Sequence, residues 1–220
     1  MNDIYEDEQI ERQEKKVPAK PIGERHLKRF KYRLEEKSKE FSSRNMTLFE
    51  LGVSTGYRSQ DIVCLTIGEI KEALYLGYFE IQEQKQYKSY LTYIKKHPNS
   101  KKKPPKKRKI GIGKSLEETL KQYIKGKRNS QYAFPSKKGT YITSKSFSRI
   151  LKEVGEELGL KNISGHSMRK TFARKIYDRY GELERVRQRL GHKSIETTKI
   201  YLGLYDEDIR EDASLFDDIF

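Results

Sequence analysis

The chain has 220 residues, which is long enough for one domain with a proper core. It is 34% hydrophobic and 36% charged, and no apolar run approaches the roughly 18 residues that a membrane-spanning helix needs. Cys64 is the only cysteine, which excludes an intrachain disulfide and a cysteine-based zinc site. We expect a cytoplasmic protein without a membrane segment, with Cys64 packed as a small core residue.

The net charge of +15 is unevenly distributed along the chain. Residues 1–17 carry −3 and residues 202–220 carry −6, so residues 18–201 carry +24. A central body this basic, between acidic ends, indicates a surface that binds a polyanion. Charge alone leaves open the alternative of a lysine-rich soluble protein without such a partner.

Hydrophobic periodicity in the first half predicts three helices and one pair of strands. Apolar residues at helical spacing predict helices over 24–40 and 46–53, and a short one over 58–65. Alternating residues over 78–84 predict a half-buried strand, and we expect 108–112 to be its partner.

The second half is predicted to be helical. Ser115-x-x-Glu118 is a capping box that opens a helix. After a turn-rich segment over 126–142, a helix runs from about 147 to 158 and stops at a glycine. Three more helices are expected after His166, over 183–190 before Gly191, and from Ser194 through Tyr201. The predicted fold class is therefore mainly α with a small antiparallel β-sheet, an α+β fold.

Composition divides the chain into three parts. Residues 1–19 form a polar acidic tail, residues 20–205 form the domain, and residues 206–220 form an acidic amphipathic helix. The apolar stripe of this last helix consists of Ile209, Ala213, Phe216 and Phe220. It predicts either a helix that docks on its own core or one that packs against a neighbouring copy.

Four chemically useful groups follow one another in the last third of the chain. His166-Ser167-Met168-Arg169 precedes Leu190-Gly191-His192, and Tyr201 follows. A forked guanidinium neutralises the non-bridging oxygens of a phosphodiester better than an ammonium does. A tyrosine hydroxyl attacks phosphorus once its proton is removed. These groups fit the cleavage of a DNA strand without a metal.

The pattern resembles the tyrosine recombinases of the phage integrase family over roughly residues 20 to 205. The family places an Arg first, then a Lys, then His-x-x-Arg, then Leu-Gly-His, with the nucleophilic Tyr nine residues after that last His. Tyr201 is nine residues after His192, and Arg58 in Thr-Gly-Tyr-Arg has an acidic Asp61 three residues later. Four motifs in the right order and separation are highly specific.

The resemblance implies a role for each of the six catalytic candidates. Arg58 and Arg169 form the phosphate clamp, and Tyr201 is the nucleophile. His166 donates to the phosphate or handles the tyrosine proton, and His192 donates to the phosphate. Lys85, at the end of the predicted strand, protonates the leaving 5′ oxygen. Two alternatives stay open: Lys88 for this lysine and Tyr205 for the nucleophile.

Residues 89–109 are predicted to be a basic insert between the two strands. The insert contains nine basic residues and no acidic one, with Pro104-Pro105 at its centre. Such a run forms a solvated, mobile loop or contacts DNA phosphates. The DNA-binding candidates are Lys88, Lys101, Lys102, Lys103, Lys106, Lys107, Arg108 and Lys170.

The function that the resemblance implies is site-specific recombination through a 3′-phosphotyrosyl intermediate. No metal or cofactor is expected, and the partners are double-stranded DNA with inverted-repeat sites and three further copies in a homotetramer. A type IB topoisomerase-like enzyme and a non-catalytic DNA-binding relative are the alternatives. The helical DNA-clamp domain that usually precedes the catalytic domain is missing, as in a truncated chain or a short single-domain member.

Overall fold

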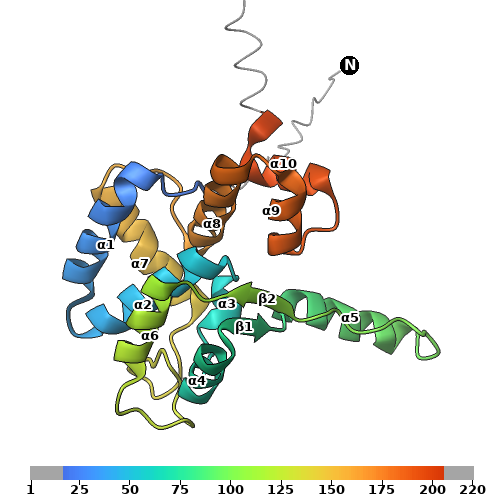
Figure 1. Cartoon of the computed structure of the whole chain (residues 1–220), viewed down its shortest axis with the longest axis horizontal. Coiled ribbons are helices and arrows are strands. Elements are labelled where there is room, and N and C mark those ends of the chain that lie inside the picture. Colours follow the sequence, from blue (N-terminus) through green and yellow to red (C-terminus); the bar gives the residue numbers. More distant parts are fainter. Residues whose placement is uncertain (1–16, 206–220) are drawn as a thin grey trace, which may run out of the picture.

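The computed structural model describes residues 17–205, and the predicted helix over 206–220 lies outside this range. Within it, helices surround one two-stranded antiparallel sheet, which confirms the predicted fold class (Figure 1). The elements are α1 (Glu24–Ser38), η1 (Lys39–Phe41), α2 (Ser42–Thr55), α3 (Ser59–Ile62), α4 (Ile67–Leu76), β1 (Tyr78–Ile81), α5 (Gln84–Lys96), β2 (Arg108–Gly111), α6 (Lys114–Ile124), α7 (Ser144–Glu157), α8 (Gly165–Tyr180), α9 (Leu183–Leu190) and α10 (Ile195–Leu202).

The main core lies around α2, which packs against α1, α6 and α8. Its helical face is apolar enough to bury Leu48, Phe49 and Leu51 completely or nearly so. Phe49 stacks on Phe30 of α1 with ring centroids 5.2 Å apart. Cys64 is only half-buried and belongs to neither hydrophobic cluster, so its predicted place in the core is wrong.

A smaller second cluster fixes the C-terminal helices. Ala173 of α8 packs with Val186 and Leu190 of α9, all without exposed surface. Tyr201 and Leu202 of α10 pack against this cluster. Because α9 ends at Gly191 in the left-handed conformation and Ser194 caps α10, the chain turns back sharply between them. Tyr201 is thereby held against α8 and α9.

The structure differs from the sequence-based predictions at one helix, one helix cap and one strand. Helix α4 was not predicted, although Thr66 and Glu69 form a complete capping box at its start. The proposed box at Ser115 is not used, because α6 begins one residue earlier after Gly113 without a side-chain cap. The strand predicted over 78–84 ends at Ile81.

The insert between the strands also differs from the predicted loop. Strand β1 pairs with β2 from Tyr78 opposite Gly111 to Ile81 opposite Arg108, and the first half of the connection is the helix α5. None of the residues of α5 is buried, and the helix extends away from the body of the molecule (Figure 1). The lysines between α5 and β2 are exposed.

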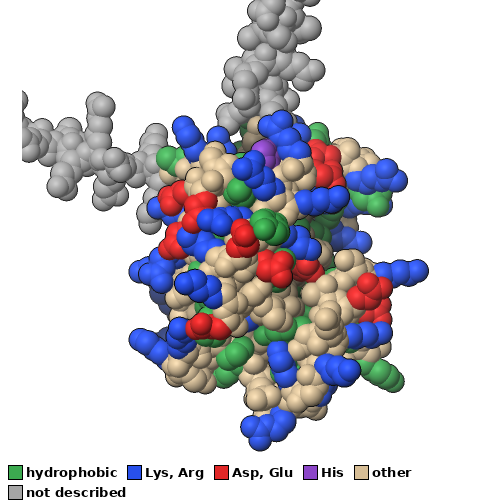
Figure 2. All heavy atoms as spheres, turned by 90° about the vertical axis from the view of Figure 1, so that its left-hand side faces the viewer, with side chains coloured by type: hydrophobic (Ala, Val, Ile, Leu, Met, Phe, Trp, Pro, Cys, Tyr) green, Lys and Arg blue, Asp and Glu red, His purple; other side chains and the backbone are tan. Residues whose placement is uncertain are grey.

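The face formed by α1 and α7 has a different charge pattern from the insert. Figure 2 shows Lys and Arg side chains mixed with acidic side chains there. Arg33 and Lys37 of α1 both form ion pairs with Glu157 of α7, at 2.6 Å each. Positive charge on this face is therefore partly compensated, whereas the insert has no acidic residue between 89 and 109.

Among residues 17–205, no helix is both long enough and apolar enough to cross a bilayer.

Gly56 is the position where the fold tolerates a side chain least. Its φ of +59° is left-handed, and an added Cβ would lie 2.7 Å from Cγ of Phe172. We expect Gly56→Ala to cost about 1–2 kcal/mol in backbone strain and about 1–3 kcal/mol more from overpacking. Urea-unfolding curves measure the sum.

Gly77→Ala is the matched control, since Gly77 also has a positive φ, +75°, but no atom within 4 Å of the added Cβ. The difference between the two variants isolates the contact with Phe172. Equal free energies of unfolding would contradict the close packing of α2 on α8.

Candidate active site

A buried carboxylate lies at the centre of the candidate site. Glu83, just after β1, is 3% exposed. Its Oε1 lies 3.1 Å from Nη1 of Arg169 and 3.3 Å from Nε of Arg108. Its Oε2 forms an ion pair with Arg58. We call Arg58, Arg108 and Arg169 the arginine cluster.

Arg169 is the most firmly held member of the cluster. It lies in the second turn of α8 and is 2% exposed. Nη1 donates to the carbonyl of Gly56 at 2.6 Å, and Nη2 donates to the carbonyl of Leu190. The guanidinium therefore ties α8 to the ends of α2 and α9, since both acceptors are orphan carbonyls of helix C-termini.

Arg58 is the most accessible member. It occupies the N-cap position of the short helix α3, and its side chain is 19% exposed. Nη1 has no hydrogen-bond partner among the described residues, although it lies in ion-pair range of Glu83. Because Nη1 is buried against Glu83, a phosphate at the surface would approach the exposed remainder of this side chain.

Arg108 was predicted to be part of the DNA-binding surface, and the structure places it in the interior. It is 9% exposed, and its Nη1 donates to the carbonyl of Arg189 at 2.6 Å. The guanidinium stacks 3.9 Å over the ring of Tyr57. Burial, followed by the charge of Arg169, lowers the pKa of Arg108 to about 10. Its side chain faces the core, because it lies two residues before Ile110 in β2 and residues two apart in a strand share one face.

His166 lies in the first turn of α8, rather than ahead of the helix as predicted. Ser164 caps the helix and forms a reciprocal box with Ser167. The side chain of His166 remains exposed. Partial desolvation, followed by the charges of Arg58 and Arg169, lowers its pKa. The imidazole therefore borders the phosphate clamp of Arg58 and Arg169.

His192 and Tyr201 lie side by side, with ring centroids 5.1 Å apart and an edge-on angle of 78°. The Nδ1 atom of His192 lies 3.1 Å from Oγ1 of Thr198, a buried residue of α10. Burial, followed by the charge of Arg169, lowers the pKa of His192 to about 4. The imidazole is therefore neutral at pH 7, and Thr198 fixes its ring.

The hydroxyl of Tyr201 is buried and forms no hydrogen bond of good geometry among the described residues, although the guanidinium of Arg169 lies near it. Burial raises the pKa of Tyr201 to about 12, and the charges of Arg169 and Arg58 partly oppose this rise. The ammonium of Lys170 lies 5.1 Å over the phenol ring. An unpaired buried hydroxyl costs free energy, so each such group calls for an explanation such as an incoming ligand.

Apart from Lys170 of α8, the lysine candidates lie in the connection between β1 and β2. Lys85 is exposed in the first turn of α5, and its charge contributes to the lowered pKa of His166. Lys88 is exposed one turn later. Five further candidates are all exposed in the connection to β2: Lys101, Lys102, Lys103, Lys106 and Lys107.

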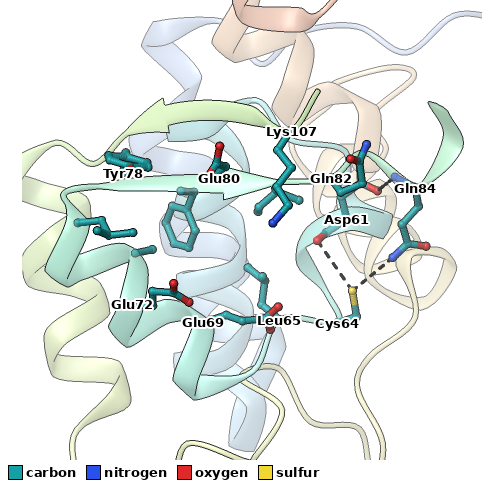
Figure 3. Close-up of a pocket in the computed structure, with 14 residues that line it drawn as sticks. Asp61, Cys64, Leu65, Glu69, Glu72, Tyr78, Glu80, Gln82, Gln84 and Lys107 are labelled. Atoms are coloured by element: carbon teal, nitrogen blue, oxygen red, sulfur yellow. Dashed lines mark hydrogen bonds between the residues drawn. The ribbon is translucent and has the colours of Figure 1, made fainter. Parts of the chain in front are cut away.

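Asp61 links α3 to the start of α5 beside the site. Its Oδ1 accepts from the backbone N–H of Gln84 at 3.0 Å. Figure 3 shows Asp61 with Cys64 and Gln84 at one end of an acidic pocket. Within residues 17–205, no group of three His, Cys, Asp or Glu residues could hold a metal ion.

Three contributors to the site were not found from the sequence. Glu83 stands among the glutamines at the end of a strand, without a motif that distinguishes it. Gln86, which donates to Glu83 at 2.8 Å, and Thr198 are equally unremarkable in the sequence. For Arg108, the alternation with Ile110 was an available signal.

Comparisons with known proteins agree with the motif pattern. The model of the "Phage integrase family" matches residues 23–208. The chain is 27% identical over 176 residues to the "Probable integrase/recombinase YoeC" of Bacillus subtilis, covering 80% of this chain and 86% of YoeC.

Two longer proteins are matched over part of their length. The tyrosine recombinase XerC of Leptospira interrogans (strain Fiocruz L1-130) is 32% identical over 111 residues, which are 48% of this chain and 36% of XerC. The fold resembles the solved XerH recombinase bound to palindromic difH substrate, with a TM-score of 0.63 at 22% identity, covering 91% of this chain and 54% of that one. The chain thus spans about a third to half the length of these two proteins.

The lowered pKa of His192 predicts a pH-dependent stability. Between pH 6.5, the ordinary pKa, and about 4, the unfolded chain binds a proton that the folded chain does not. The free energy of unfolding should therefore fall as pH is lowered through this window. His192→Asn should flatten the dependence in urea-unfolding curves, whereas the exposed His97→Asn should leave it unchanged. An identical pH dependence in wild type and His192→Asn would contradict the burial of a neutral imidazole.

Proposed function

The chain belongs to the phage integrase family, the tyrosine recombinases, and we propose that it cleaves and rejoins DNA through Tyr201. The observation that carries this assignment is the buried, unpartnered hydroxyl of Tyr201 beside His192 and the arginine cluster. A phosphodiester held by these cationic groups would present its phosphorus to the hydroxyl.

Cleavage in this proposal is an in-line displacement at phosphorus. The Oη atom of Tyr201 forms a bond to phosphorus, and the bond to the 5′ oxygen breaks. The phenol proton passes to a phosphate oxygen or to His166, and Lys85 supplies a proton to the leaving oxygen. A 5′ hydroxyl of the partner strand then attacks the 3′-phosphotyrosyl link and releases Tyr201. The link conserves the bond energy, so the reaction needs no ATP.

The arginines supply charge where the transition state develops it. Arg58 and Arg169 neutralise the equatorial oxygens of the phosphorane, in a site that excludes water on the Arg169 side. His192 donates from Nε2 to a phosphate oxygen in the tautomer whose Nδ1 accepts from the hydroxyl of Thr198, and this hydroxyl must then turn away from the carbonyl of Ser194. The raised pKa of Tyr201 keeps the phenol protonated until DNA is bound.

Two duplexes must meet for strand exchange, so we propose a homotetramer on paired inverted-repeat sites. The related XerH was solved on its difH substrate, which makes a specific DNA site the expected partner of this chain too. The predicted amphipathic segment over 206–220 remains the candidate for contacts between protomers.

Covalent capture tests the nucleophile. A nicked duplex that loses its 5′ fragment should trap wild-type protein on DNA in the presence of EDTA. Tyr201→Phe should form no adduct, because the attacking oxygen is gone. Tyr205→Phe is the control, since Tyr205 is 43% exposed four residues later, and it should form the adduct normally. An adduct with Tyr201→Phe, or its loss with Tyr205→Phe, would refute the assignment.

Removing Arg58 should separate catalysis from binding. Arg58→Ala should lower single-turnover cleavage roughly 100- to 1,000-fold, the usual effect of losing one transition-state donor. Duplex affinity should change little, because many other basic groups contact phosphates. Arg33→Ala, on the face formed by α1 and α7, is the control and should cleave normally. Equal losses of affinity and cleavage by Arg58→Ala would make Arg58 part of the DNA-binding surface only.

The exposed insert lysines should determine the salt dependence of DNA binding. Changing Lys101, Lys102, Lys103, Lys106 and Lys107 to Gln should flatten log affinity against log salt by about 0.9 for each phosphate that is no longer neutralised. Five changes to Gln on the face formed by α1 and α7 should leave the slope of log affinity against log salt unchanged. These changes are at Lys28, Lys31, Lys37, Lys145 and Lys152. Equal slopes for the two five-fold variants would show that the insert does not bind the duplex.

A further inference from the structure

Both carboxylate oxygens of Glu83 are occupied by basic or amide groups. Oε1 faces Arg169 and Arg108, while Oε2 pairs with Arg58 and accepts from Nε2 of Gln86. The residue is 3% exposed, so water contributes little to its solvation. Glu83 is therefore the anion on which three guanidinium groups of different elements converge.

The charges of this group do not cancel. Three guanidinium groups contact one carboxylate, so these four side chains together carry two positive charges in excess. The carboxyl of Asp61 also interacts with Arg58 and Arg169 and offsets part of this excess where it is ionised. Burial alone would raise the pKa of Glu83, but the charges of Arg169, Arg108 and Arg58 outweigh it and lower the pKa. The carboxylate is therefore ionised at neutral pH and remains part of the charge balance.

The members of the cluster depend on Glu83 to different degrees. Arg169 and Arg108 also donate to backbone carbonyls. The only ion pair of Arg58 among the described residues is with Glu83. Without the carboxylate, repulsion from two buried guanidinium groups would displace the partly exposed Arg58 towards solvent.

Glu83 also connects the cluster to the other candidate groups. Glu83 is the N-cap residue of α5, two residues before Lys85, and its carboxylate contacts the first turn of α5 by accepting from Nε2 of Gln86. Gln86 bridges the carboxylate to the carbonyl of Gly191, at 2.8 and 3.4 Å, directly before His192. Glu83 thus contacts the arginine cluster directly, and through Gln86 it is connected to the turn that carries His192.

We propose that Glu83 is the positioning residue of the phosphate clamp, which orients Arg58 and leaves two positive charges uncompensated for the scissile phosphate. The proposal rests on the proposed function of the site. A phosphodiester carries one negative charge, and the phosphorane formed by an attacking phenolate carries two. The excess charge of the cluster therefore matches the transition state better than the ground state, which is the condition for catalysis.

Single-turnover cleavage of the nicked duplex tests the positioning role. Glu83→Gln keeps the shape and removes the charge, so cleavage at saturating DNA should fall roughly 100-fold, as expected for a misplaced group. The dissociation constant for the duplex should stay at the wild-type value. Glu83→Asp retains the charge and should recover part of the loss. Wild-type cleavage by Glu83→Gln, or no recovery with Glu83→Asp, would overturn the proposal.

Glu50→Gln is the matched control. Glu50 is also a partly buried glutamate, which pairs with Lys31 at 2.5 Å and accepts from Thr119, but it lies on α2 outside the candidate site. This variant should cleave at the wild-type rate. A loss equal to that of Glu83→Gln would show a general effect of glutamate removal and overturn the specific role of Glu83.

Thermal unfolding in sodium sulfate gives a test without DNA. Glu83→Gln leaves two buried guanidinium groups and the partly exposed Arg58 without their anion. Sulfate should therefore raise its Tm more than it raises that of wild type or Glu50→Gln, compared with chloride at equal ionic strength. Equal shifts would overturn the proposal. Because this readout needs no cleavage, inactive wild-type protein would refute the proposed function while the sulfate comparison still decides the role of Glu83.

Discussion

Burying several guanidinium groups side by side costs several kcal/mol per ion unless hydrogen bonds and opposite charge compensate. In this chain the compensation comes from one carboxylate, Glu83, and from carbonyls at the ends of helices. The acceptors for Arg169 are carbonyls that α2 and α9 cannot satisfy internally. The guanidinium of Arg169 therefore supplies hydrogen bonds that the helix ends lack, and the helix ends supply acceptors that the buried guanidinium needs. The position of each depends on the other.

This constraint explains why distant segments meet at one place. Arg58 follows α2, Glu83 follows β1, Arg108 starts β2 and Arg169 lies in α8. The second apolar cluster then presses α10 against α8 and α9, which brings Tyr201 and His192 to the same point. Hydrophobic packing holds the helices together, while the contacts of Arg169 with Glu83 and with the helix-end carbonyls fix how α2, α8 and α9 are placed relative to one another. The protein thereby holds positive charge next to an unpartnered hydroxyl.

The sequence predicted the structure correctly where a characteristic residue type occurs at a characteristic spacing. His-x-x-Arg, Leu-Gly-His and the tyrosine nine residues later indicated the family, and helix stops such as Gly191 were correct because a left-handed residue favours glycine. Helix α5 was missed because it buries no residue, so no core-facing pattern distinguishes it from a lysine-rich loop. Glu83 was missed because its partners are far away in sequence, and pairing over such separations leaves no local pattern. Arg108 was named as a DNA-binding residue, whereas the structure buries it against Glu83.

A crystal structure of Tyr201→Phe bound to a duplex site tests the central claim most directly, namely that the phosphate binds at the arginine cluster while Glu83 stays in place. We predict non-bridging oxygens of one phosphate within about 3 Å of nitrogen atoms of both Arg58 and Arg169. The Glu83 carboxylate should remain in contact with all three arginines. A complex in which phosphates contact only the insert lysines, with Arg58 directed away from the DNA, would contradict the account.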